Sequence, residues 1–592
     1  MQRATLPELL ATRARQTPNA NAHWSLDIHG QWSPTNISQF YLQAVDLAWQ
    51  LKTLGIEKGQ TVIVLAASSS QWELAHHAIL MLGGIIVGID PEETSEHLET
   101  ISTLVKIDAM IIDRVGRLEK FGDSVFNQIS TVISLEDASE SGKSKLHSVT
   151  IHDHLDEKLD HTVLSTAIFP NDIATIIFTS GTTGTPKGIA YRHEQIVTAI
   201  QAILDTFPEI GQAPCHLVCW LPLSNLFQRI VNLCALAGGS EIFFVTQPQK
   251  IIEYLPQINP HVFIAVPRFY EKLYQEVENK LNRQPKPIYH LLCYCLSAGE
   301  NDSPVGCLFR FINRHLFKSF TSLFGCNIRY LISGSAPIPI WLLKRFYATG
   351  LLILESYGLS ENVVPIAANR GNDYRFGTVG KPLSPNRVIL AEDGELLVKG
   401  SGVFGGYVAE QQEDRRLTTD GYLASGDYAE IDEHGYIRLT GRKSDVFKTS
   451  TGRKIAPVEI EDLLKSHSKI EHAVVFGANR KFLTTLVTVG AERPEDANEM
   501  LDFARKLAKT LAETAAELPN YKRPVGAVLS FSSLSVERNE LTRNLKLLRR
   551  NIQRDYGTWI NQLYDALDNG DSTIHQQPLL IEPNIVLLKL PA

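Results

Sequence analysis

The chain has 592 residues, which is too long for one hydrophobic core, so two or more domains are expected. Its formal net charge of −8, without a clustered basic face, argues against nucleic-acid binding, and its ordinary apolar content argues against wholesale disorder. The start of the chain lacks the apolar core of a signal peptide, and seven cysteines without zinc-ligand spacing favour free thiols in a reducing cytoplasm.

The first two thirds of the chain alternate strand and helix patterns. "QTVIVLAA" (60–67) predicts a buried strand, and "AILMLGGIIVGI" (78–89) predicts the end of a buried helix followed by a strand. The latter run is too short and too rich in glycine to span a bilayer, which takes about 20 apolar residues. This βαβ alternation predicts an α/β fold, in which mixed or parallel sheets are covered by helices.

The pattern changes near residue 430. "YAEIDEHGYIRLTGR" (428–442) predicts a hairpin, "STGRKIAP" (450–457) predicts a second turn, and Pro457 suits the first position of a helix. We therefore expect a large N-terminal domain over residues 1–441 and a smaller, mobile α+β domain over 442–565. A tail over 566–592 follows, in which "NIVLLKL" (584–590) is expected either to add an edge strand or to dock on the body of the protein.

The segment "FTSGTTGTPKG" (178–188) lies between a predicted strand, "DIATIIF" (172–178), and a predicted helix over 192–207. A strand, a glycine-rich loop and a helix form an anion site, to which the hydroxyls add donors and Lys187 adds charge. The segment is not a Walker A loop, because Lys187 precedes Gly188 and no Ser or Thr follows. A plain surface loop is the alternative to a polyphosphate site.

The same segment resembles [YF]-T-S-G-[ST]-T-G-x-P-K-G, the phosphate-loop signature of the adenylate-forming superfamily, which includes acyl-CoA synthetases, luciferases and peptide-synthetase adenylation domains. The resemblance implies that ATP and Mg²⁺ bind here, and that Thr179 also contacts the metal. The implied nucleotide-binding residues of this loop are Thr179, Ser180, Gly181, Thr182, Thr183, Gly184 and Lys187.

Two further segments resemble nucleotide-binding blocks of the superfamily. "YLISGSAPIP" (330–339) is similar to its adenine-contacting segment, which implies roles for Gly334, Ser335 and Ala336. "LESYGLSEN" (354–362) is similar to its Y-G-x-[ST]-E block. There Tyr357 would stack on adenine, Glu361 would ligate Mg²⁺, and the intervening contacts would be Gly358 and Ser360.

The resemblance continues beyond residue 410. In "TTDGYLASGDYAEI" (418–431) Asp427 would bind the ribose hydroxyls, and in "LTGRKSD" (439–445) Arg442 would reach the ribose or a phosphate. Ser444 stands at the hinge, where Asp or Lys is usual. The loop "TSTGRK" (449–454), with Gly452, would line the channel of the thiol acceptor after the C-terminal domain rotates.

The segment "NELTRNLKLLRR" (539–550) resembles the ending of long-chain fatty acyl-CoA synthetases, and Lys546 would be the catalytic lysine, with Arg442 and Lys187 as further catalytic residues. Arg543 and Asn544 replace the usual Pro-Thr. A solvated surface lysine is the alternative for Lys546.

The segment "VPRFYEKLY" (266–274) resembles the bacterial long-chain branch, as does the long stretch that follows it. That stretch predicts helices with wide apolar faces and interspersed cations, for which core packing is the favoured explanation and contact with a membrane surface the alternative. In "WLPLSNLFQR" (220–229), similar to a block that lines the acyl-carboxylate site, Asn225 replaces the usual His and Gln228 the usual Glu.

The resemblance implies a cytoplasmic long-chain fatty acid–CoA ligase that uses ATP, Mg²⁺ and coenzyme A. Two alternatives stay open: a ligase that loads an acyl carrier protein or another acceptor, and a non-catalytic acyl- or nucleotide-binding relative. The oligomeric state is not predicted.

Overall fold

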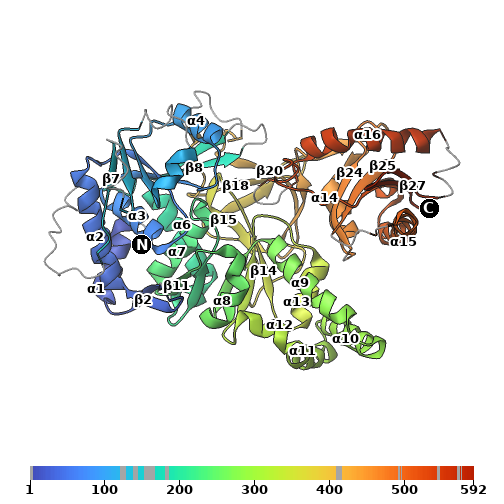
Figure 1. The fold of residues 1–592 in the computed structure, drawn as a ribbon, viewed down its shortest axis with the longest axis horizontal. Helices are drawn as coiled ribbons and strands as arrows, with labels where there is room; N and C mark the ends of the chain where they lie inside the picture. Colours follow the sequence, from blue (N-terminus) through green and yellow to red (C-terminus); the bar gives the residue numbers. More distant parts are fainter. Residues whose placement is uncertain are drawn as a thin grey trace.

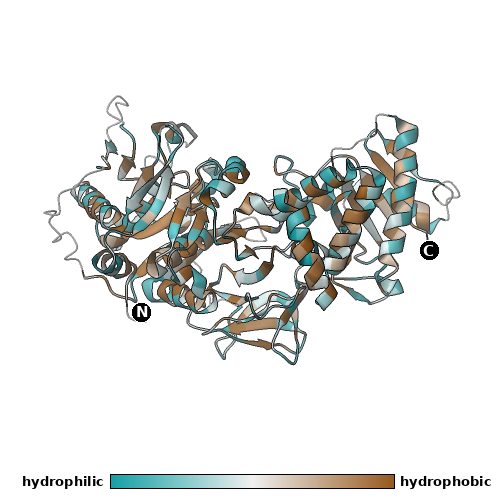
Figure 2. Cartoon of the chain, turned by 90° about the horizontal axis from the view of Figure 1, so that it is seen from below, coloured by the Kyte–Doolittle hydropathy of each residue, from teal (hydrophilic) through white to brown (hydrophobic). Residues whose placement is uncertain are grey.

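The computed structural model describes residues 4–27, 29–120, 129–137, 145–152, 167–180, 186–408, 416–467, 469–490, 494, 496–542, 547–569, 574 and 577–591. Several sheets pack with their helices into a large N-terminal part, and a smaller lobe holds the C-terminal strands and helices (Figure 1). Many strands are hydrophobic along their length, whereas the surrounding helices carry many hydrophilic residues (Figure 2). The predicted α/β class is confirmed.

The largest sheet has the strand order β19-β9-β8-β4-β3-β5-β6-β7. Strands β3 to β7 and β8 form parallel pairs, while β9 pairs antiparallel with both β8 and β19. The bounds are β3 (Thr61–Leu65), β4 (Ile85–Ile89), β5 (Ala109–Ile112), β6 (Thr131–Ser134), β7 (Leu146–Ser148), β8 (Ile173–Ser180), β9 (Pro186–Arg192) and β19 (Tyr407–Val408).

Helices cover both faces of this sheet because successive side chains of a buried strand point to opposite sides. Val62 and Val64 of β3 join one hydrophobic cluster, and Ile63 and Leu65 join another. The first cluster is covered by α1 (Leu6–Gln16), α2 (Ile37–Thr53), α3 (Ser70–Met81), α6 (His193–Thr206) and α7 (Leu226–Gly238), and the second by α4 (Ser95–Leu104). The strand and helix predicted from residues 60–89 are confirmed as β3, α3 and β4.

One expectation for the glycine-rich segment is wrong. The helix predicted over 192–207 is confirmed as α6, but the loop leads first into a strand, β9, which was not predicted. "PKGIAYR" contains β-branched and aromatic residues, and its Ile189 and Tyr191 are fully buried, so the segment completes an antiparallel pair with β8. The N-terminus of α6 therefore does not follow directly on the loop.

A second sheet has the order β12-β13-β14-β15-β16, with β12, β13 and β14 parallel. The strands are β12 (Val262–Ala265), β13 (Tyr330–Ser333), β14 (Ile353–Leu359), β15 (Asn362–Ala368) and β16 (Lys381–Pro382). One hydrophobic cluster joins it to α8 (Ile251–Ile258), α9 (Pro267–Asn282) and α13 (Ile340–Ala348). Helices α10 (Lys286–Gly299), α11 (Pro304–Leu316) and α12 (Lys318–Thr321) follow α9, and α10 and α11 lie at an outer edge of the molecule (Figure 1).

Two four-stranded sheets complete the N-terminal part. One has the order β10-β11-β1-β2, with β1 (Asn21–Leu26), β2 (Trp32–Asn36), β10 (His216–Cys219) and β11 (Glu241–Phe244). The other is antiparallel, with the order β17-β18-β20-β21, and contains β17 (Arg387–Leu390), β18 (Glu395–Lys399), β20 (Leu423–Ile431) and β21 (Ile437–Arg442). The hairpin predicted over 428–442 is thus confirmed.

The C-terminal lobe begins with a ribbon of β22 (Phe447–Lys448) and β23 (Lys454–Ile455). Its sheet has the order β24-β25-β26-β28-β27, with α14 (Pro457–Leu464) and α15 (Ala497–Ala515) on one face and α16 (Arg549–Asp568) on the other. The strands are β24 (Ile470–Phe476), β25 (Leu483–Val489), β26 (Pro524–Ser530), β27 (Leu579–Glu582) and β28 (Ile585–Lys589). The helix predicted to begin at Pro457 is confirmed.

The tail forms the hairpin β27–β28, and its predicted strand is present. It is not an edge strand, because β28 pairs with β26 on one side and β27 on the other. Ile585, Val586, Leu587 and Leu588 are at most 4% exposed, so both faces of β28 contribute to the core of the lobe. Of the helices that the structure describes, none is both long enough and apolar enough to cross a membrane.

Candidate active site

Tyr357, Asp427 and Arg442 come from three distant segments and meet beside β20. The Tyr357 hydroxyl donates to Asp427 Oδ2 over 2.5 Å, and Arg442 Nε lies 3.3 Å from Asp427 Oδ1. Asp427 and Arg442 face each other in the register of β20 and β21. Asp427 is buried, whereas half of the Arg442 side chain is exposed. A buried carboxylate beside an accessible guanidinium can bind the hydroxyls and phosphates of a nucleotide.

The turn before Asp427 fixes the direction of its carboxylate. Gly426 has a φ of +77°, a backbone conformation that favours glycine, and its N–H donates to Glu395 Oε1 over 2.9 Å. The Asp427 N–H donates to Ser425 Oγ over 3.0 Å. The mild replacement of the family's Thr by Ser425 therefore keeps an acceptor at this place.

Glu361 lies in the turn between β14 and β15 and forms a second cluster. Its Oε1 accepts a hydrogen bond of 2.8 Å from the Tyr407 hydroxyl and lies 2.8 Å from Arg416 Nη2. Lys187 Nζ is 4.3 Å from the centre of the Tyr407 ring, which is within the range of a cation–π contact. The Tyr191 hydroxyl donates to the Ser360 carbonyl over 2.5 Å and fastens this turn to β9. Sequence reasoning did not single out Tyr407 or Arg416.

The glycine-rich loop connects the ends of β8 and β9, where Thr179 is the register partner of Lys187. Gly181, Thr182, Thr183 and Gly184 lie outside the described residues, as does the side chain of Ser180. Thr179 and Lys187 nonetheless place both ends of the loop beside Tyr407, because Ile189 of β9 pairs with Tyr407 of β19.

The segment after β13 supplies another part of the site. Ser333 ends a fully buried strand, and Ser335 and Ala336 are exposed immediately beyond it. Ser335 has a φ of +72°, which is uncommon for a residue other than glycine and is concentrated at functional sites. Ligands of α/β sheets bind at the carboxyl ends of the parallel strands, which is where Gly334, Ser335 and Ala336 lie.

The residues expected to hold Mg²⁺ fit that ion in chemical type. Glu361 and Thr179 offer a carboxylate and a hydroxyl, and Mg²⁺ prefers hard oxygen ligands, few of them from the protein. The side chain of Glu361 is 12% exposed and its Oε1 is already neutralised by Arg416. A metal at this carboxylate would share it with Arg416 or displace it.

The chain segment after Arg442 is anchored on both sides of Ser444. Lys443 Nζ lies 2.8 Å from Asp393 and 2.6 Å from Glu395, both of the N-terminal part. Asp445 lies 3.3 Å from Arg549 Nε, at the start of α16. Ser444 itself donates only to its neighbour Asp445 in the described contacts, over 3.0 Å.

Two further predicted residues, Gly452 and Lys546, follow Asp445 in the sequence. Gly452, with a φ of +81°, forms the turn between β22 and β23. Lys546 lies outside the described residues, but Leu541 and Leu547 on either side of it form a β-bridge, and α16 begins three residues later at Arg549.

The segment 220–229 runs from a partly exposed turn into the buried helix α7. Asn225 caps α7, accepting a hydrogen bond of 3.0 Å from the Phe227 N–H. Gln228 is buried and accepts from the Leu221 N–H over 3.3 Å. Arg229 is fully buried and donates to Thr175 Oγ1 over 2.8 Å, and burial lowers its pKa to about 10. The Asn225 substitution therefore leaves a helix cap, which Asn provides well.

A buried polar cluster on α3 was not predicted. Glu73, His76 and His77 offer ligand atoms that lie within 4.8 Å of one another, and Asn232 Nδ2 donates to Glu73 Oε2 over 3.0 Å. Burial lowers the pKa of His76 to about 4, so this imidazole is neutral at pH 7. Because Glu73 and the buried Arg229 attract each other, the cluster balances its own charge. The signal in the sequence was one acid and two histidines among the apolar residues of α3.

Glu355 is a second buried acid that sequence reasoning missed. It lies on β14, two residues before Tyr357, and one of its oxygens accepts a hydrogen bond of 3.3 Å from the Gly377 N–H. Burial raises its pKa to about 8, against the effect of the Gly377 hydrogen bond, and Asp462 of α14 raises it further.

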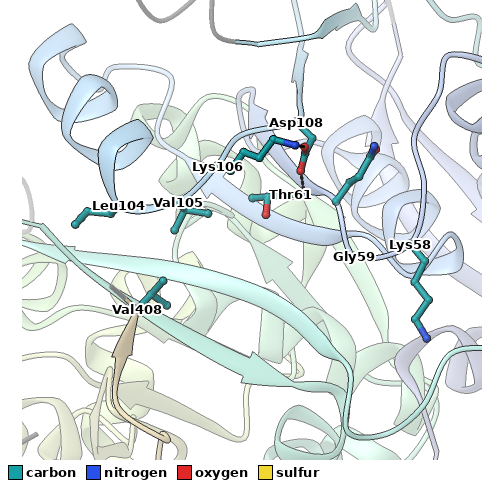
Figure 3. Close-up of a pocket in the computed structure, with 9 residues that line it drawn as sticks. Lys58, Gly59, Thr61, Leu104, Val105, Lys106, Asp108 and Val408 are labelled. Carbon is teal, nitrogen blue, oxygen red and sulfur yellow. Dashed lines mark hydrogen bonds and ion pairs between the residues drawn. The ribbon is translucent and has the colours of Figure 1, made fainter. Parts of the chain in front are cut away.

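A shallow recess of about 560 Å³ lies outside these clusters, between the residues that follow α4 and the loop before β3 (Figure 3). Lys106 pairs with Asp108 over 2.6 Å there, and Asp108 accepts from the Thr61 N–H. Val408 borders this recess, whereas its neighbour Tyr407 contacts Glu361. Adjacent residues of a strand face opposite sides, so the recess is separate from the Glu361 cluster.

Comparisons with known proteins show the family and the fold of this chain. A family model described as AMP-binding enzyme matches residues 10–408, and one described as AMP-binding enzyme C-terminal domain matches residues 444–568. Long-chain-fatty-acid–CoA ligase FadD15 of Mycobacterium tuberculosis is 28% identical over 545 residues, covering 90% of this chain and 89% of its own. Long-chain-fatty-acid–CoA ligase 5 of Rattus norvegicus is 26% identical and covers 89% of this chain and 84% of its own.

Solved structures show the same fold at lower identity. The adenylation domain of a carboxylate reductase from Mycobacterium chelonae has a TM-score of 0.73 at 19% identity, covering 95% of this chain and 91% of that one. O-succinylbenzoate coenzyme A synthetase from Bacillus subtilis, in complex with AMP, has a TM-score of 0.65 at 19% identity, with coverage of 93% and 98%. From the family match over most of its length, this chain belongs to the AMP-binding enzymes, the adenylate-forming superfamily that its phosphate loop resembles.

Proposed function

We propose that this chain activates a long-chain fatty acid with ATP and transfers the acyl group to coenzyme A. The observation that carries the proposal is the contact of Tyr357, Asp427 and Arg442, which unites three family segments beside the turn that holds Glu361. The long-chain substrate is supported by the names of the relatives, which are long-chain-fatty-acid–CoA ligases from bacteria and animals.

The nucleotide would bind at the carboxyl ends of β13 and β14. Asp427 would accept hydrogen bonds from the ribose hydroxyls, and the exposed half of Arg442 would reach a phosphate or the ribose. Gly334, Ser335 and Ala336, with Tyr357, would border the adenine. The loop between Thr179 and Lys187 would surround the outer phosphates, with backbone N–H groups and hydroxyls as donors.

In the first half-reaction, a carboxylate oxygen of the fatty acid attacks the α-phosphorus of ATP. The bond from that phosphorus to the bridging oxygen breaks, and pyrophosphate leaves with its electron pair. Catalysis of this step is mostly positioning and neutralisation of charge. Lys546 would contribute a movable positive charge where the carboxylate meets the α-phosphate. Mg²⁺ held by Glu361 and Thr179 would neutralise part of the triphosphate charge.

In the second half-reaction, the sulfur of coenzyme A forms a bond to the acyl carbon of the acyl adenylate. The bond from that carbon to the AMP oxygen breaks, AMP leaves, and the thiol proton is lost. Rotation of the C-terminal domain about residues 442–445 would withdraw Lys546 and bring the turn at Gly452 to the acceptor channel. The seven free cysteines are consistent with a cytoplasmic enzyme.

The test is pyrophosphate release from MgATP with a panel of C6 to C20 fatty acids, with and without coenzyme A. The proposal predicts release that depends on a long-chain acid and turns over only with coenzyme A. A single turnover that coenzyme A leaves unchanged, but that an acyl carrier protein converts to steady turnover, would establish the alternative acceptor. The absence of release with every acid would refute fatty-acid activation.

A further inference from the structure

Exposed hydrophobic side chains are concentrated on α10 and α11. Of sixteen large hydrophobic residues that are exposed in the described part of the chain, eight belong to these two helices. They are Ile288, Leu291 and Tyr294 on α10, and Val305, Leu308, Phe311, Ile312 and Leu316 on α11. The expectation that the apolar faces of this region pack in the core is therefore wrong for these residues.

The spacing of these residues shows that each helix has an apolar face, which the rest of the described protein does not cover. The exposed residues of α10 recur every three positions, as do Val305, Leu308 and Phe311 on α11, which places them along one side of each helix. The opposite sides hold buried residues such as Leu296 and Asn313, which join the helices to the rest of the protein. Leu291 is 60% exposed and Phe311 66%.

The two exposed faces are adjacent at the ring of Tyr294, which meets that of Phe309 edge to face with 5.7 Å between centroids. The helices lie at an outer edge of the molecule, away from the largest sheet (Figure 1). Monomeric soluble proteins rarely expose apolar side chains in such density, and larger patches of this kind mark interaction surfaces.

The charges around the patch indicate its partner. Residues 283–318 contain five Lys or Arg and two acids in a chain whose net charge is −8. Both acids are already paired, Glu300 with Arg345 over 2.8 Å and Asp302 with Arg310 over 3.6 Å. Lys286, Arg314 and Lys318 are exposed around the hydrophobic residues. An apolar face bordered by cations is the pattern of a segment that lies in the interface of an anionic bilayer.

A second copy of the chain fits this surface less well. A symmetric dimer brings the same patch of two subunits together, so the cations at its border would face their own copies. We propose that α10 and α11 dock this protein peripherally on a membrane rich in anionic lipid, with the apolar residues in the acyl boundary and the cations among the headgroups. Only the reason for membrane binding rests on the proposed function: the long-chain fatty acid substrate partitions into such a membrane.

The test is flotation of the full chain with vesicles, without ATP or fatty acid. We expect binding to vesicles of phosphatidylcholine with phosphatidylglycerol, weakened by added salt, and much weaker binding to phosphatidylcholine alone. The double variant Leu291→Asn/Phe311→Asn should bind at least about tenfold more weakly. The matched control, Ile389→Asn/Leu390→Asn, removes two exposed hydrophobic residues from β17 and should bind as the wild type does.

Charge reversal tests the electrostatic part separately. Arg314→Glu/Lys318→Glu should abolish the preference for anionic over neutral vesicles. Binding that is absent, or that the α10 and α11 variants leave unchanged, would overturn the proposal. A wild-type dimer that the Leu291→Asn/Phe311→Asn variant dissociates, without vesicle binding, would assign the surface to a second copy instead. Because the assay contains no substrate, its outcome is independent of pyrophosphate release.

Discussion

Replacing Glu355 with Gln should change how the stability of the protein depends on pH. Burial raises the pKa of Glu355 from its usual 4.5 to about 8, so the folded protein holds this carboxyl protonated at neutral pH, whereas the unfolded chain does not. The folded state binds more protons between these values, so its stability falls as the pH rises from 4.5 to 8. At about 1.4 kcal/mol per pH unit, the loss is roughly 5 kcal/mol.

Gln has nearly the same shape, cannot ionise and can still accept the hydrogen bond from the Gly377 N–H. The Glu355→Gln variant should therefore resemble the wild type at pH 5 and become more stable than it as the pH rises to 9. For a protein of this size, whose unfolding entropy is about 2.1 cal/mol/K per residue, roughly 5 kcal/mol corresponds to a difference of about 4 °C in melting temperature.

The assay is thermal unfolding of both proteins from pH 5 to 9, with the exposed Glu392→Gln as the matched control. Buried histidines titrate in the same experiment: burial lowers the pKa values of His23, His76 and His193 to about 4, which gives stability that is lost as the pH falls below 6.5. Their contributions cancel in the difference between variant and wild type. A difference in melting temperature that stays constant from pH 5 to 9 would refute the reasoning.

Three other substitutions or deletions have defined outcomes. Lys546→Ala should abolish formation of acyl adenylate yet leave thioester formation from supplied acyl adenylate within about a few fold, with Arg550→Ala as control; equal loss of both steps would contradict its role. Asp427→Ala removes the proposed acceptor of two ribose hydroxyls, and each hydrogen bond to a charged group contributes about 1.5–3 kcal/mol. Calorimetry should therefore show that the variant binds ATP at least about a hundredfold more weakly, whereas the control Asp420→Ala should bind ATP as the wild type does. Ending the chain at residue 577 removes both β27 and β28, and the four buried side chains of β28 contribute about 1.5–3 kcal/mol each, so the C-terminal lobe should unfold; a lobe that still melts cooperatively would show that this hairpin is dispensable.

Apolar runs predicted the elements that lie inside the sheets. The strand at residues 61–65 and the helix before residue 82 were predictable because nearly every side chain in them is buried, so local pattern and global packing agree. The strand after the glycine-rich loop was not predicted, because the flexible residues before it favour a loop. The pairing of Ile189 with Ile177 depends on the tertiary structure and not on the local sequence. The helical periodicity of α10 and α11 predicted an apolar face but could not show that it remains uncovered.

The sequence named candidate site residues, but it could not show the contacts between them. Family segments pointed to Tyr357 and Asp427, whereas their direct hydrogen bond depends on how β14 and β20 meet. Arg416 was overlooked because it lies in a charged stretch without a motif, and only folding brings it to Glu361. Glu355 is visible in the sequence as a single acid after an apolar run. The sequence alone could not show that it is buried, because that depends on how the strand packs.

The two ion-paired anchors beside Ser444 have a mechanical consequence. Lys443 is attached to the N-terminal part and Asp445 to α16, so a turning of the C-terminal domain that keeps both anchors would twist the backbone at Ser444 and break the hydrogen bonds that the Asp445 and Val446 N–H groups donate to the Arg442 carbonyl. Such a joint permits rotation with little sliding. Its stiffness would depend on ionic strength, because Lys443 is 45% exposed and salt screens exposed charges. At high salt the two ion pairs would weaken, so the backbone bonds of several residues would turn and the rotation would no longer have one fixed axis.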